Sequence, residues 1–165
     1  MVHVAGCGIS HILMAVDAIS IQDRLFPTMT CFGCGPANPR GLRLKSYLGD
    51  GCVTATFVPW PEHDNGLGFL NGGIIATVLD CHTAAGVLNE ASAQGWEAAP
   101  GALLPFVTAG IDVRYQRPSP LDSAVELRAV VIKSTEAEIV CDAELLYDDK
   151  IRATGRAVWK RWRSR

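Results

Sequence analysis

The stretch Asn71-Gly72-Gly73-Ile74-Ile75-Ala76-Thr77-Val78-Leu79-Asp80 decides the fold, because it begins a long and nearly uncharged segment. Between Asn65 and Asn89 the sequence holds one formally charged side chain, that of Asp80. The small and apolar residues here predict a helix of four or five turns, from near residue 71 to near residue 88. A helix that is apolar on nearly every face must be buried on nearly every side. A sheet wrapped around the helix is the simplest arrangement that buries these faces.

The segments on either side of this helix supply such a sheet. Residues 42–48 and 52–58 alternate in polarity around Gly49-Asp50-Gly51, which predicts a β-hairpin. Later segments rich in Val, Ile and Leu predict four more strands, at residues 106–117, 124–133, 137–147 and 151–162, the last two joined by a tight turn at Asp148-Asp149. The predicted fold class is therefore α+β, with an antiparallel β-sheet wrapped around a long central α-helix.

Length and composition indicate one globular domain. The chain has 165 residues, of which 48% are hydrophobic and 19% charged, and its formal net charge is −2. That charge creates no field that would attract nucleic acid or an anionic membrane, and we expect the basic tail 160–165 to be a solvated chain end. No uncharged run reaches the roughly 18 apolar residues that a membrane span needs. We predict neither a nucleic-acid nor a membrane partner.

The N-terminal region predicts an extension before the domain. Residues 1–20 are apolar but lack a basic start, and His3, His11 and Asp17 interrupt them, so we do not expect a secretion signal. A helix is predicted from about residue 10 to residue 25, ending before Pro27. We assign residues 1–29 to the extension, 30–162 to a single domain and 163–165 to a tail.

The six cysteines are scattered, which suits a reducing cytoplasm better than a disulfide framework. Cys31-x-x-Cys34 is half of a zinc site, but no second pair of Cys or His with ligand spacing follows it. We therefore predict no metal and no cofactor, and interpret this segment as a structural loop shaped by Pro36 and Pro39. The expected location is the cytoplasm.

Asp80 is the leading candidate for chemistry. On a helix, Gly73, Thr77, Asp80 and Ala84 lie on one face, so the carboxylate sits on a line of small residues. A lone carboxylate in a low dielectric is costly unless it is paired, and such groups gather at functional sites. The alternative is a structural aspartate that bonds to a neighbouring backbone group or hydroxyl. Cys81 and His82 do not complete a triad, because consecutive helical side chains point about 100° apart. His82 either faces a cavity or is a partnered core residue.

The two glycines at the helix start are the second candidate. Their N–H groups lie at the positive end of the helix dipole, where a carbonyl or phosphate could approach closely. The alternative is that they only make the turn. Asp80 lies seven residues beyond Gly73, so the two are about 10 Å apart along the axis. They can meet one reacting carbon only if two antiparallel helices pair, which predicts a site shared between subunits.

Three motifs carry a family resemblance. "CFGCGPANPRGLRL" at 31–44, "GFLNGGIIATVLDCHTAA" at 68–85 and "VRYQRPSP" at 113–120 resemble the hotdog-fold acyl-CoA thioesterases of the phenylacetate-pathway type, within the 4-hydroxybenzoyl-CoA thioesterase superfamily. The similarity covers roughly residues 31–159. It implies a hotdog fold and dimers, often paired into tetramers, with two sites across each dimer interface.

The resemblance also implies roles for individual residues. The Gly72 N–H would polarise the thioester carbonyl, and Asp80 would act as general base on water or as nucleophile. Asn65 falls where a family asparagine helps to hold substrate or water, and Thr108 falls where a family serine assists and keeps its hydroxyl. Asn71 replaces the histidine of the family's His-Gly-Gly motif, so a group that can change charge near pH 7 is missing. The candidate substrate-binding residues are Gly73, His82, Arg114 and Arg117.

We interpret the two arginines either as ligands of the coenzyme A phosphates or as ordinary charges at a strand edge. No complete dinucleotide-binding or phosphate-loop motif is present. The predicted function is hydrolysis of an acyl-CoA to the free acid and coenzyme A. A non-catalytic acyl-CoA or small-ligand binding protein is the alternative, and a hotdog dehydratase is a weaker third, because we find no convincing acid/base pair for it.

Overall fold

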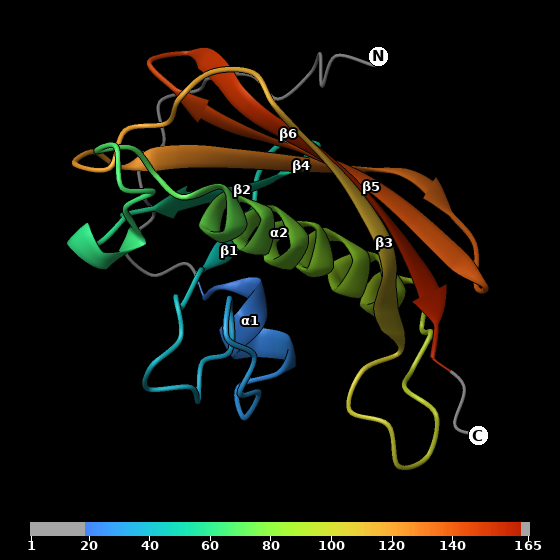
Figure 1. Ribbon diagram of the computed structural model, residues 1–165. Helices are drawn as coiled ribbons and strands as arrows, with labels where there is room; N and C mark the ends of the chain where they lie inside the picture. The colour runs from blue at the N-terminus through green and yellow to red at the C-terminus, as the bar shows by residue number, and fades with distance from the viewer. Residues whose placement is uncertain (1–18, 163–165) are drawn as a thin grey trace.

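Six strands form one antiparallel sheet that curves around a single long helix, as seen in the computed structural model, which describes residues 19–162 (Figure 1). The strands are β1 (Ser46–Leu48), β2 (Val53–Phe57), β3 (Phe106–Tyr115), β4 (Val125–Ser134), β5 (Glu138–Tyr147) and β6 (Lys150–Arg161). Their order across the sheet is β1-β2-β4-β5-β6-β3, and every neighbouring pair is antiparallel. The predicted fold, an antiparallel sheet wrapped around a long central helix, is confirmed.

The long helix α2 (Gly72–Ala93) has well-defined ends. Asn71 caps its start, since its side-chain oxygen accepts the Gly73 N–H at 2.7 Å. At its end Gly95 has a φ of +70°, and the Trp96 N–H donates to the Ala91 carbonyl at 2.9 Å. This left-handed glycine cap stops the helix about five residues later than predicted, because polar residues past residue 88 do not themselves end a helix.

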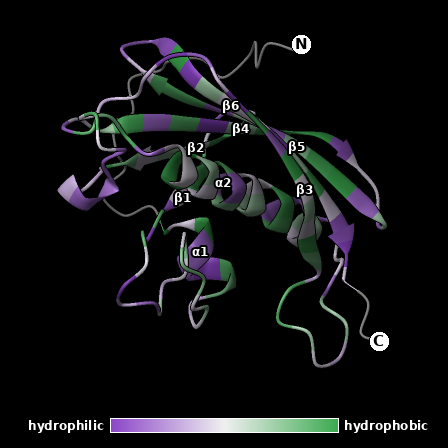
Figure 2. Ribbon diagram, viewed as in Figure 1, coloured by the Kyte–Doolittle hydropathy of each residue, from purple (hydrophilic) through white to green (hydrophobic). Residues whose placement is uncertain are grey.

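The core lies between α2 and the sheet. Val78, Leu79, Ala85, Val87 and Ala91 of α2 are fully buried. On the sheet side, alternate residues of β4 and β5 are buried, and Figure 2 shows hydropathy changing along the strands in the same way. Burial of α2 on several faces is what its apolar composition requires.

The hairpins follow the predictions closely. β1 pairs with β2 as expected, but β1 is shorter than predicted because the chain before it bonds elsewhere. The Leu42 N–H donates to the Phe32 carbonyl at 2.7 Å, and the Leu44 N–H donates to the Gly33 carbonyl at 2.9 Å. Asp148 and Asp149 both have a φ of +53°, as a two-residue turn between β5 and β6 requires.

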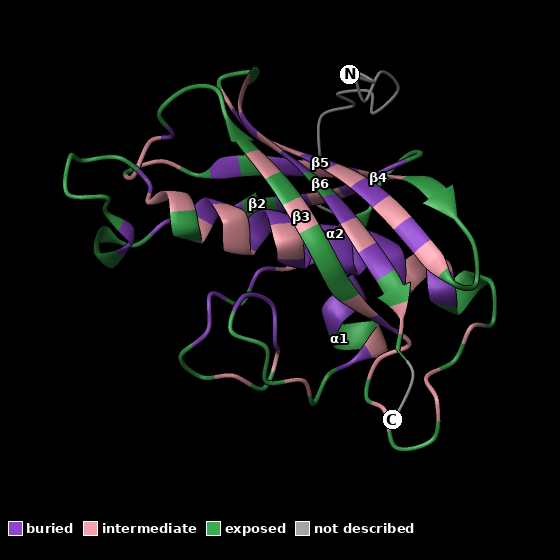
Figure 3. Cartoon of the chain, turned by 45° about the vertical axis from the view of Figure 1, so that its right-hand side comes forward, coloured by how far each residue is buried: buried purple, intermediate pink, exposed green. Residues whose placement is uncertain are grey.

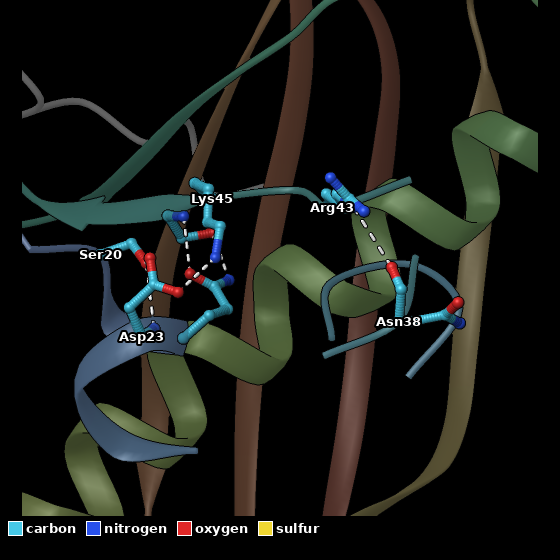
Figure 4. A network of polar contacts seen from close by, with 7 residues as sticks. Ser20, Asp23, Asn38, Arg43 and Lys45 are labelled. Atoms are coloured by element: carbon cyan, nitrogen blue, oxygen red, sulfur yellow. Dashed lines mark hydrogen bonds and ion pairs between the residues drawn. The ribbon is translucent and has the colours of Figure 1, made fainter. Parts of the chain in front are cut away.

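The short helix α1 (Ile21–Leu25) packs below α2, as Figure 1 shows. Ser20 is extended and caps α1 by accepting the Asp23 N–H, so the predicted helix from residue 10 to residue 25 is wrong at Ser20. Residues 10–18 of that prediction lie outside the described residues. An ion pair between Lys45 and Asp23 ties α1 to the segment before β1 (Figure 4).

Residues 26–45, which we call the cysteine loop, connect α1 to β1 and are ordered by their own hydrogen bonds. The Gly35 N–H donates to the Cys31 carbonyl at 2.9 Å, and the Ala37 N–H donates to the Met29 carbonyl at 3.0 Å. The Arg43 side chain donates to the Asn38 carbonyl at 3.2 Å (Figure 4). These bonds fix the loop independently of regular secondary structure.

Four cysteines in the described part of the chain are free, namely Cys31, Cys34, Cys81 and Cys141. Cys52 is disulfide-bonded, which differs at that position from the expectation of reduced cysteines. Between residues 19 and 162, no helix combines the length and the apolar character that crossing a membrane demands.

Candidate functional site

Asp80 lies in the third turn of α2 and meets Thr108 of β3. The Thr108 hydroxyl donates to an Asp80 carboxylate oxygen at 2.9 Å, across 28 residues of sequence. A β-bulge helps to aim this side chain, because Ala109 has no partner between the pairs Thr108–Trp159 and Gly110–Val158. The structure thus brings together two of the residues predicted for the site.

The surroundings of Asp80 favour its neutral form more than water does. Burial raises the pKa of the Asp80 carboxyl, and the hydrogen bond from Thr108 opposes this without cancelling it. The side chain is only partly buried, so it stays within reach of a ligand. A carboxylate with a raised pKa is a stronger base than one in water, which suits proton abstraction.

The N-terminal end of α2 presents backbone amides that are not all taken up within the helix. The Gly73 N–H is taken by the Asn71 side chain. The Gly72 N–H begins the helix, and the first N–H groups of a helix have no acceptor within it. Of the two glycines, Gly72 is the one whose N–H has no acceptor among residues 19–162, and it is the donor that the family resemblance implies.

Tyr115, at the end of β3, is a contact of this helix end that sequence reasoning missed. Its hydroxyl donates to the Gly72 carbonyl at 2.8 Å. A Cβ atom added at Gly72 would lie 3.4 Å from the Tyr115 ring. Tyr115 stands inside the quoted stretch "VRYQRPSP", but only the pairing of β3 at the sheet edge places it over the helix start.

The two halves of the candidate site remain apart within one chain. Gly73 and Asp80 belong to the same straight element, about 10 Å apart along its axis. Asn65 also stays in its own loop, where its side-chain oxygen accepts the Leu67 and Phe69 N–H groups at 2.9 and 3.3 Å. The described contacts of Asn65 are thus structural ones.

His82 lies in the core between α2 and the β1–β2 hairpin, and has no solvent exposure. One ring nitrogen bonds to the Ser46 hydroxyl at 3.0 Å and the other to the Val53 carbonyl at 3.1 Å. Burial lowers the pKa of His82 to about 4, so it is neutral near pH 7. This geometry matches the core-histidine alternative and separates His82 from Asp80.

The two arginines lie at the exposed edge of the sheet. Arg114 pairs with Asp112 at 3.2 Å, and both side chains are well exposed. Arg117 donates to the Ile151 carbonyl at 3.4 Å. Neither is recorded in contact with Asp80 among the described residues, although both are free to reach a ligand outside the sheet.

Sequence reasoning also missed a cluster of three thiols beside Asp80. The sulfur atoms of Cys31, Cys34 and Cys81 all lie within 4.8 Å of one another. Hydrogen bonds from Cys34 and Cys81 hold the pKa of the Cys31 thiol well below its usual range. The same contact with Cys31 raises the pKa of Cys34 to about 12. Cys81 follows Asp80 directly, so the cluster includes a thiol from the same turn of α2 as the carboxylate.

Comparison with known proteins gives a match at the level of structure. No family model matches the sequence, and no curated protein matches it. A thioesterase superfamily protein from Shewanella loihica PV-4 is 28% identical, with 73% of this chain and 91% of that chain covered and a TM-score of 0.57. A phenylacetic acid degradation-related protein from Ralstonia eutropha JMP134 is 20% identical, with 86% and 99% covered and a TM-score of 0.63.

The PaaI protein from the phenylacetic acid degradation operon of E. coli is 18% identical, with 74% of this chain and 81% of that chain covered and a TM-score of 0.59. These matches agree with the family resemblance carried by the sequence motifs. The chain therefore has the hotdog fold of the thioesterase superfamily.

Proposed function

We propose that this protein is an acyl-CoA thioesterase that hydrolyses an acyl-CoA to the free acid and coenzyme A. The observation that carries the proposal is the Asp80 carboxylate, partly buried on a small-residue face of α2 and held by the Thr108 hydroxyl. The 28% identical structural relative is a thioesterase superfamily protein, which supports the same reaction class.

In the proposed mechanism Asp80 is the base. It takes a proton from water, and the resulting hydroxide attacks the thioester carbonyl carbon. The negative charge that develops on the carbonyl oxygen is stabilised by the Gly72 N–H at the start of the helix. The carbon–sulfur bond then breaks, and the coenzyme A thiolate leaves and takes up a proton. Direct attack by Asp80 would instead form an anhydride, which water then opens to give the same products.

The proposed site is shared between two copies of the chain. Asp80 of one copy would face Gly72 of the other, because the two groups are too far apart on one helix to meet one carbon. The outer edge of β3 supports this arrangement, since β3 ends the sheet and most of its residues are exposed in front of α2 (Figure 3). An exposed edge strand of ten residues is a natural surface for pairing.

The remaining predicted residues would act around this centre. Thr108 orients Asp80, and Asn71 holds the glycine turn open by capping the helix. Asn65 is proposed to position substrate or water, as the family resemblance implies. Arg114 and Arg117 would meet the phosphates of coenzyme A, since guanidinium groups bind phosphate with paired hydrogen bonds.

One observation favours a second candidate function, a non-catalytic acyl-CoA or small-ligand binding protein. Asn71 stands where the resembled family has histidine, and its side chain is committed to the Gly73 N–H. A protein that lost catalysis while keeping the fold would retain the helix cap and the open amide of Gly72. Both candidate functions predict that the protein binds acyl-CoA, and only the thioesterase predicts turnover.

The deciding experiment is an assay over short, long and aromatic acyl-CoAs, with free coenzyme A measured by chromatography. A thiol reagent is unsuitable, because Cys31 is itself exposed and free. The variant Asp80→Asn removes the base, and Asp148→Asn, an exposed aspartate in the turn between β5 and β6, is the matched control. Turnover in the wild type and in the Asp148→Asn protein, lost in the Asp80→Asn protein, supports the hydrolase. Binding without turnover over the whole panel supports the second candidate.

A further inference from the structure

Three thiols from two separate elements converge where the cysteine loop meets α2. Cys31 and Cys34 come from the loop, and Cys81 comes from the helix 47 residues later. Cys34 and Cys81 are buried, each with 4% of its surface exposed, whereas Cys31 reaches solvent. A metal ion entering from the Cys31 side would therefore find two further sulfur ligands behind it.

The separations of the sulfur atoms suit one small metal ion. The Cys31 and Cys81 sulfurs are 3.7 Å apart. Two thiolates on a tetrahedral zinc ion, each with a bond of about 2.3 Å, lie about 3.8 Å apart. Since no pair in the cluster exceeds 4.8 Å, any remaining adjustment of a sulfur–sulfur distance is about 1 Å.

The backbone of the cysteine loop is built around this cluster. A Cβ atom added at Gly33 would lie 2.3 Å from the Cys81 sulfur, so only glycine lets the loop approach the helix this closely.

We propose that Cys31, Cys34 and Cys81 bind one zinc ion, which joins the cysteine loop to the turn of α2 that carries Asp80. Thiolates select soft divalent ions, and a Cys-x-x-Cys pair with a third cysteine supplies three of the four ligands of a tetrahedral site. The fourth position lies on the solvent side, beside Cys31, and would hold water. The site is independent of whether Asp80 hydrolyses thioesters.

A disulfide explains the arrangement less completely. It would join two of the three cysteines and leave the remaining thiol without a role, whereas one metal ion uses all three. A sulfur–sulfur bond of about 2.0 Å would also require the atoms to move much closer than they stand.

The test measures metal content in the full-length protein, purified under reducing conditions without a metal-binding tag and then dialysed after addition of zinc chloride. We expect one zinc per chain by mass spectrometry of the elements. Cobalt(II) added in place of zinc should give the intense sulfur-to-cobalt charge-transfer absorption of a thiolate site. The variant Cys81→Ala should lose both signals. Cys141→Ala, which also removes a free buried thiol but on β5, should keep both.

The wild-type cobalt spectrum tests the proposal even if Cys81→Ala fails to fold. A wild-type protein that binds no zinc and gives no thiolate–cobalt absorption would overturn the proposal. So would a folded Cys81→Ala protein that retains zinc at the wild-type level. Peptide mapping of the air-exposed protein that finds a disulfide between two of Cys31, Cys34 and Cys81, together with absence of zinc, would assign the cluster to a disulfide instead.

Discussion

Replacing Asp80 by asparagine should separate catalysis from stability more sharply than any other change in this protein. Asparagine keeps the shape of the side chain and an oxygen that can accept the Thr108 hydroxyl, which lies 2.9 Å away. It removes the negative charge, and with it both the base and the nucleophile. Catalytic turnover should therefore respond to the lost charge, whereas stability should respond to the shape and hydrogen bonding that asparagine keeps.

The expected effect on catalysis is large. Loss of a positioned general base costs about 10² to 10⁴ in rate, or roughly 3 to 5 kcal/mol of transition-state stabilisation. The Michaelis constant should change little, because the contacts that bind the substrate are retained.

The expected effect on stability is small, because two terms oppose each other. Burial raises the pKa of Asp80 above its unfolded value, so the ionised carboxylate destabilises the folded state at neutral pH. A neutral side chain removes that cost. The substitution also exchanges a charged hydrogen bond for a neutral one, a loss of about 1 kcal/mol. The free energy of unfolding should thus stay within about 1 kcal/mol of the wild-type value.

The assay combines urea unfolding, acyl-CoA binding and release of coenzyme A, on the wild type, Asp80→Asn and the control Asp148→Asn. The reasoning is refuted if Asp80→Asn unfolds several kcal/mol more easily while its folded fraction keeps full turnover. That outcome would identify Asp80 as a structural aspartate.

Three other predictions concern assembly, capping and acid stability. Sedimentation at micromolar concentration should show at least a dimer, and a monomer that hydrolyses thioesters at full rate would contradict the shared site. Asn71→Ala should cost about 1 kcal/mol of stability, because the Gly73 N–H loses its acceptor; equal unfolding midpoints would exclude this capping role. Burial lowers the pKa of His82 in the folded protein to about 4, so the folded state favours the neutral imidazole. The stability that this gives is complete above the unfolded pKa near 6.5 and is lost as the pH falls toward 4, a change of about 3 kcal/mol in the free energy of unfolding. Unfolding free energies at pH 7 and pH 5 should differ less in His82→Gln than in the wild type; an equal pH dependence in the two proteins would contradict a buried neutral histidine.

The sequence by itself determined the secondary structure well, because the signals for it are local. The nearly uncharged segment after Asn71 became α2, and Gly49 to Gly51 became the turn of the first hairpin. Asp148-Asp149 became a turn with positive φ at both residues. Alternation, glycine placement and capping act within a few residues, so they can be recognised without knowing the fold.

Family motifs predicted the thioesterase-like fold, which is confirmed, and named Asp80 as the catalytic candidate, but contacts between distant segments depended on the tertiary structure. Thr108 reaches Asp80 because β3 lies at the sheet edge with a bulge beside it. His82, which could have faced a cavity, lies in the core because its helical face turns toward the β1–β2 hairpin.

The thiol cluster is the clearest case of such dependence. Sequence spacing presents Cys31 and Cys34 as half of a zinc site and offers no second pair. Cys81 joins them because the cysteine loop folds back against α2 at Gly33, where no side chain keeps the two backbones apart. Local patterns specify which segments form helices and strands, whereas packing alone decides which side chains from distant segments share one site.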